Sequence, residues 1–140
     1  MNVKLILVVL SVLFFFGCAT KLWYQPKKYS DIKQSVDIIK RSLRYQSPSH
    51  AVNSVDVTPN YIKVVGVRDE VNYINFDNIS KIELHEKRKW KIVSILAPQD
   101  FLMYRLYVTD EKMAREFINA VYTLEHSQRK DIEKALKLEQ

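Results

Sequence analysis

The apolar residues of this chain follow three different spacings. An almost unbroken apolar run covers residues 5–16. A stripe with steps of four and three residues then predicts a helix over residues 30–46; its apolar members are Ile32, Val36, Ile39 and Leu43. Beyond residue 51 the apolar positions alternate or cluster in short runs rich in β-branched and aromatic residues, which is typical of strands.

Six such runs predict six strands, at residues 51–57, 61–67, 71–76, 79–85, 90–97 and 101–108. The breaks between them are short and contain Pro, Asn or Asp, which can close tight turns without glycine. Short links predict that consecutive strands pair antiparallel, as a meander. One face of the sheet is expected in the core and the other in water.

A second helix is predicted after the last strand, capped by Thr109 or Asp110. Its apolar face is broad enough to be buried against a sheet and consists of Met113, Ala114, Phe117, Ile118, Val121 and Leu124. The stripe lapses over residues 127–130 and resumes at Ile132. Either this helix continues past the domain or a second short helix follows.

With 140 residues, 27% of them charged and 47% hydrophobic, the chain suits one globular α+β domain. The formal net charge is +6; residues 1–17 hold one of the 22 basic residues and none of the 16 acidic ones, so the remainder carries about +5. This mild excess favours an anionic membrane surface or an acidic partner. Nucleic acid is not expected as a partner, because an exported chain leaves the cytoplasm.

Cys18 is the only cysteine, which excludes an intramolecular disulfide and a cysteine-based metal site. The two glycines, Gly17 and Gly66, are too few for a phosphate-cradling loop, so P-loop and Rossmann proteins are excluded as well.

The segment that ends in Gly17-Cys18-Ala19 resembles a bacterial lipoprotein signal. Lys4 gives a basic start, and the apolar run 5–16 is shorter than the ~20 residues that span a bilayer. Phe15 departs from the family pattern, which usually has leucine there. The resemblance implies that residues 1–17 are a signal peptide and that Cys18 carries fatty acid such as palmitate, anchoring the protein to a membrane. The alternative is an ordinary secretory signal followed by an incidental cysteine.

Residues 18–29 are then expected to be a tether. They mix basic residues with Trp23, Tyr24 and Tyr29. These aromatic rings either sit at the level of the lipid headgroups or fold back onto the domain.

The order of strands followed by one amphipathic helix resembles the pleckstrin-homology-like (PH-like) and GRAM-like domains of bacteria. The resemblance covers residues 51–126, rests on the runs 73–84 and 104–110 and on Ala114, Phe117 and Ala120, and implies a strongly bent antiparallel sheet or partly open barrel with a C-terminal helix. Residues 30–46 would be an extra N-terminal helix and 127–140 a helical extension. The runner-up is an open antiparallel sheet with helices on one face.

Candidate chemistry is sparse. His50, His85 and His126 share no metal-ligand spacing, so no metal or other cofactor is expected. Glu83 and His85 share a strand face and could hold an acid and a base, but surface alternation explains them more simply and no nucleophile is in view. We therefore expect no enzyme activity.

The densest charge follows one predicted strand and forms a candidate interaction surface: Lys87, Arg88, Lys89, Trp90 and Lys91. It can equally be a solvated hairpin end that discourages edge pairing.

Three functions are compatible with the sequence. The first is a membrane-anchored, non-catalytic module of the cell envelope that binds a protein partner along a sheet edge beside the C-terminal helix. The second is a small-molecule-binding or enzyme-accessory lipoprotein. The third is a structural envelope protein that uses residues 131–140 for helix contacts. Ala19, where an inner-membrane lipoprotein would carry aspartate, implies the outer membrane facing the periplasm if the source is Gram-negative.

Overall fold

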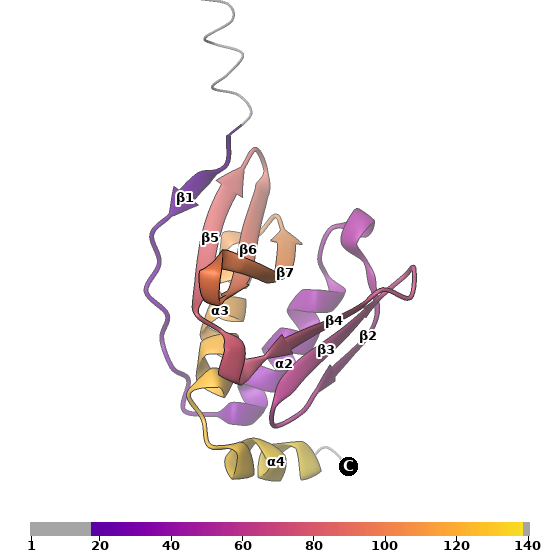
Figure 1. The fold of residues 1–140 in the computed structure, drawn as a ribbon, viewed down its shortest axis with the longest axis vertical. Helices are drawn as coiled ribbons and strands as arrows, with labels where there is room; N and C mark the ends of the chain where they lie inside the picture. The colour runs from indigo at the N-terminus through magenta and orange to yellow at the C-terminus, as the bar shows by residue number, and fades with distance from the viewer. Residues whose placement is uncertain (1–17, 139–140) are drawn as a thin grey trace, which may run out of the picture.

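The computed structural model describes residues 18–138, in which two antiparallel sheets enclose a core together with three helices (Figure 1). One sheet has the strand order β2-β3-β4 and the other β1-β5-β6-β7. The α+β class with antiparallel pairing is confirmed, and neither sheet closes into a barrel. The strands are β1 (Thr20–Leu22), β2 (Val52–Val57), β3 (Tyr61–Gly66), β4 (Val71–Asn75), β5 (Lys81–Lys87), β6 (Trp90–Ala97) and β7 (Phe101–Val108); the helices are α2 (Ile32–Arg44), α3 (Glu111–Glu125) and α4 (Arg129–Lys137).

The three-stranded sheet follows the predicted alternation. In β3 every second residue is buried, and its core-facing side chains meet those of the neighbouring strands. Ile62, Val64 and Ile74 are at most 1% exposed. The helix predicted over residues 30–46 is shorter at both ends and covers Ile32–Arg44; Asp31 caps its start, and the Asp31 carboxylate accepts a hydrogen bond from Lys33 N at 2.9 Å.

The meander prediction is wrong at one junction, because β4 and β5 do not pair. A short 3₁₀ turn, Phe76–Asn78, separates them and carries the chain from one sheet to the other. Phe76 is 2% exposed, so its ring is buried in the core at this point. Its backbone N–H donates to Asn60 O in the turn between β2 and β3, whereas Ser80 N donates to Leu96 O in β6 of the second sheet.

Helix α3 covers the inner face of the four-stranded sheet (Figure 1). Asp110, one of the two predicted caps, accepts a hydrogen bond from Lys112 N at 2.8 Å. The apolar stripe of the helix is buried as expected, with Phe117, Val121 and Leu124 fully inaccessible. Helix α2 packs against α3 and borders β2, so the two sheets share one core.

A separate helix follows α3, which decides between the two alternatives for the C-terminal region. Helix α4 packs against α2 through Ile132, which is fully buried. Arg129 forms an ion pair with Asp77, and its guanidinium lies 5.4 Å from the Phe76 ring. Within residues 18–138, no helix combines the length and the apolar character that a bilayer crossing requires.

Candidate functional site

Cys18 is exposed and lies two residues before strand β1. The prediction for residues 1–17 lies outside the described residues. Strand β1 pairs antiparallel with β5, so that Thr20 is opposite Glu86 and Lys21 opposite His85. Because the strands are antiparallel, the chain before Thr20 runs toward the turn between β5 and β6. Cys18 and this turn therefore lie at the same end of the molecule, opposite α4 (Figure 1).

The turn carries four of the five residues of the candidate interaction surface. Lys87 pairs with Trp90 across it, and Arg88 adopts a left-handed backbone conformation with φ 55° that lets two residues reverse the chain. Lys87, Arg88 and Lys89 are exposed. Lys89 Nζ lies 5.1 Å from the centre of the Trp90 ring, within reach of a cation–π contact. We call residues 87–90 the basic turn.

Lys91, the fifth residue, has a different environment. Its side chain is only 12% exposed and forms an ion pair with Glu86. Within the part of the chain that the structure describes, Lys87, Arg88 and Lys89 form no ion pair with a carboxylate. The three positive charges of the basic turn are thus uncompensated.

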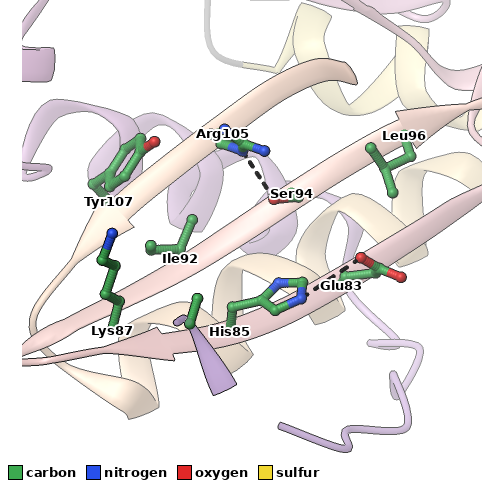
Figure 2. Close-up of a pocket in the computed structure, with 9 residues that line it drawn as sticks. Glu83, His85, Lys87, Ile92, Ser94, Leu96, Arg105 and Tyr107 are labelled. Atoms are coloured by element: carbon green, nitrogen blue, oxygen red, sulfur yellow. Dashed lines mark hydrogen bonds and ion pairs between the residues drawn. The ribbon is translucent and has the colours of Figure 1, made fainter. Parts of the chain in front are cut away.

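The outer face of the four-stranded sheet continues from this turn and contains a shallow cavity of about 450 Å³ (Figure 2). Ile92 and Leu96 of β6 supply apolar surface, and Arg105 and Tyr107 border it from β7. Arg105 Nε donates to Ser94 Oγ at 3.4 Å. Ala19 also lines this cavity, so the residue after Cys18 contacts the same face as the basic turn.

A charge cluster surrounds Glu83, the member of the cluster that lines the cavity. Lys21 Nζ donates to Glu83 Oε1 at 2.9 Å, and Lys81 Nζ lies 3.4 Å from the same oxygen and 2.8 Å from Asp100 Oδ1. The hydrogen bond from Lys21, supported by Lys81, holds the pKa of Glu83 below its usual value although partial burial acts in the opposite direction. Hydrogen bonds to Asp100 and Glu83 raise the pKa of Lys81.

The structure brings Glu83 and His85 together, with 3.8 Å between Glu83 Oε2 and His85 Nε2. Glu83 is already held by two lysines, which makes it an ionised salt-bridge partner. The other two histidines contact tyrosines: His50 stacks on Tyr107 at 4.0 Å and His126 lies 4.1 Å from Tyr122, measured between ring centres. No group of three or more acidic, histidine or cysteine side chains within residues 18–138 is arranged to hold a metal ion.

Residues 23–29, expected as part of a tether, lie along α3 (Figure 1). Asn119 Oδ1 accepts hydrogen bonds from the Tyr24 hydroxyl and from Lys27 N, both at 2.8 Å. Thr123 Oγ1 accepts one from Tyr29 N at 2.9 Å. Tyr24 and Tyr29 pack against the core, whereas Trp23 is 82% exposed.

Fold-back of the aromatic residues was one of the two alternatives for this segment and holds for Tyr24 and Tyr29, but the docking of its backbone on α3 was not predicted. The β5 edge of the four-stranded sheet is paired with β1 of the same chain, so this edge is already occupied. The signal was the pair Asn119 and Thr123, two polar residues one helical turn apart within a buried face. Buried polar side chains require partners, and here the partners are backbone groups of residues 27 and 29.

Comparisons of this chain with protein-family models, with curated proteins and with solved structures give no match.

Proposed function

We propose that this protein is a bacterial lipoprotein whose Cys18 is acylated after removal of residues 1–17, and that its folded part is a non-catalytic binding module in the cell envelope. The observation that carries the proposal is the position of Cys18: it follows the apolar run 5–16 and Gly17, and it is exposed just before the first strand. An acyl group there leaves the fold undisturbed and ties it to a membrane.

Substitution of Cys18 tests the anchor. Cys18→Ser should abolish metabolic labelling by fatty acid and release the protein from membranes, because the sulfur is the acceptor of the lipid. Thr20→Ala, an exposed change two residues away, should retain the label and the membrane fraction. Continued labelling of the Cys18→Ser protein would remove the basis for the anchor.

For the fold we propose a PH-like unit made of β2 to β7 and α3. Two features support this proposal. A three-stranded sheet precedes a second antiparallel sheet along the chain, and the amphipathic helix α3 follows the last strand and covers the second sheet. The bend at Phe76–Asn78 supports this assignment too, since it turns the chain from one sheet into the next. An experimental structure tests it: strands β4 and β5 that continue into one flat sheet would contradict it.

For the binding activity, the partner proposed first is an envelope protein. Because β5 is paired with β1 and α3 is covered by residues 23–29, two other surfaces are proposed for a protein partner. They are the edge of β2, which pairs with no second strand among residues 18–138, and the outer face of the four-stranded sheet. Affinity capture of the anchored protein from its native membrane, with partners identified by mass, tests this proposal. Recovery of no specific protein would count against it.

A second candidate, binding of a small molecule, is favoured by the cavity of the outer face. Its volume of about 450 Å³ lies in the range of small-molecule sites, and apolar Ile92 and Leu96 are accompanied by Arg105 and Tyr107. Such a ligand would have an apolar part and an acidic group. Native mass spectrometry of the purified protein distinguishes the candidates, because a bound small molecule adds a discrete mass that Arg105→Glu should remove.

The third candidate, a structural role for the C-terminal extension, predicts that deletion of residues 127–140 leaves the domain folded. Fully buried Ile132 favours the opposite result, since its removal would uncover part of the core. Ala19 beside the anchor supports placement in the outer membrane, facing the periplasm, in a Gram-negative cell.

A further inference from the structure

The distance between the anchor and the folded sheet is very short. Ala19 is the only residue between the acylated Cys18 and β1, and the two residues 18–19 span at most ~7 Å. This linker can lengthen only if structure is lost, because β1 is paired with β5 and residues 24–29 are hydrogen-bonded to α3. A lipid at Cys18 would therefore hold one end of the domain against the membrane surface.

The basic turn is at that end. In the antiparallel register Thr20 is opposite Glu86, so Ala19 is level with Lys87, and both line the same cavity. The surface potential of an anionic membrane extends over about one Debye length, ~8 Å at physiological salt. Residues 87–90 thus lie within the range of that potential whenever Cys18 is anchored.

The chemistry of the turn suits lipid headgroups. Lys87, Arg88 and Lys89 present uncompensated positive charges within the described chain, and such clusters are attracted to anionic lipids. Trp90 adds an amphipathic ring of the kind that is favoured at the boundary between headgroups and acyl chains. The opposite end of the molecule, formed by α4, has its basic residues interspersed with Asp131 and Glu133.

We propose that the basic turn is a second membrane contact, which binds anionic phospholipid headgroups beside the lipid on Cys18 and fixes the orientation of the domain. The inference rests on the anchor proposed above. A basic patch next to an acyl chain strengthens attachment. It also holds β5, β6 and β7 at a defined angle to the bilayer, with α4 directed away from it.

Fluorescence of Trp90 provides the test. The full-length gene is expressed with Trp23→Phe, which leaves Trp90 as the only tryptophan. The lipoprotein is purified from membranes and reconstituted in vesicles of brominated phosphatidylcholine, with or without phosphatidylglycerol. We expect strong quenching of Trp90 in the anionic vesicles and weaker quenching at high salt. The double variant Lys87→Glu/Lys89→Glu should lose the additional quenching.

The matched control is Lys130→Glu/Lys134→Glu on α4, which changes the net charge equally at the opposite end and should leave the quenching intact. Acylation is read separately from the intact mass. If Cys18 carries no lipid, the anchor proposal fails; its free thiol, the only one in the chain, is then coupled to a maleimide-bearing lipid and the same measurement follows. If Trp90 is not quenched in anionic vesicles, the turn does not contact lipid and is free for another partner such as an acidic protein, and the proposal is overturned. Equal losses of quenching in the two double variants would overturn it as well.

Discussion

Asn119 holds the segment of residues 24–27 on helix α3. Its Oδ1 accepts from the Tyr24 hydroxyl and from Lys27 N, and the residue is 8% exposed. Asn119→Ala removes both hydrogen bonds, each worth ~1 kcal/mol net. The higher helix propensity of alanine does not change this equilibrium, because α3 is helical in both the docked and the open state. Docking of the segment should therefore weaken by roughly 2 kcal/mol, about 30-fold in its opening equilibrium.

The amide of Tyr29 reports on this change. Its N–H donates to Thr123 Oγ1 and not to Asn119, so the substitution does not remove its own partner. We expect its hydrogen exchange to accelerate about 30-fold in Asn119→Ala. The amide of Val93 in the central strand β6 should exchange at its original rate. Tyr24→Phe is the graded control: it removes one of the two hydrogen bonds and leaves the ring that Arg115 covers at 4.8 Å.

Unchanged protection of the Tyr29 amide in Asn119→Ala would contradict this prediction, since the segment would then be held by contacts other than these hydrogen bonds. Faster exchange of Tyr29 in Tyr24→Phe than in Asn119→Ala would contradict it too. Parallel acceleration at Val93 would show global unfolding and contradict the claim that the segment opens locally.

Two acidic groups should respond to pH with opposite sign. Lys21 lowers the pKa of Glu83 in the folded protein. The stability that this ion pair contributes is therefore complete above about pH 4.5, the ordinary pKa of the carboxyl group, and is lost as the pH falls through the lower pKa of the folded state. Glu83→Gln should remove this pH dependence from the urea-unfolding midpoint. Burial raises the pKa of Glu125, so its ionised form destabilises the fold, and Glu125→Gln should raise the midpoint at neutral pH. A lower unfolding midpoint of both variants at neutral pH would refute the opposite signs assigned to Glu83 and Glu125. Ile132→Ala should lower the free energy of unfolding by ~2–4 kcal/mol. Leu138→Ala, at a side chain that is 73% exposed, should change it by less than ~0.5 kcal/mol; equal effects would show that α4 is not part of the core.

Local patterns were sufficient for six strands and the positions of the helices. Strands β6 and β7 begin and end at the predicted residues, because β-branched runs are bounded by Pro98, Asp100 and Thr109. The break between β4 and β5 was predicted as well, but not that the chain passes there from one sheet to the other. Whether Phe76–Asn78 forms a hairpin turn or a bend between sheets depends on the burial of the Phe76 ring, which is a tertiary property.

Strand β1 could not be read from the sequence for a different reason. Three residues are too short to show a period, and their partner β5 lies more than sixty residues away. The basic turn, in contrast, was visible as a charge run, but its relation to Cys18 arises only from the register of β1 on β5. The Lys91–Glu86 pair likewise depends on the strand register, which places the two residues opposite each other.

The docked segment changes what an anchor at Cys18 means physically. A flexible tether of twelve residues, as in the range 18–29, would allow a root-mean-square reach of ~18 Å and every orientation of the domain. With β1 paired to β5 and Tyr24 to Tyr29 held on α3, only residues 18 and 19 are not held by the fold. The four-stranded sheet then connects the membrane anchor directly to the core. The energy that stabilises docking therefore also restricts orientation. Weakening it at Asn119 leaves the short pairing of β1 with β5 as the remaining restraint, and should therefore loosen the contact between the basic turn and the lipid without altering either one.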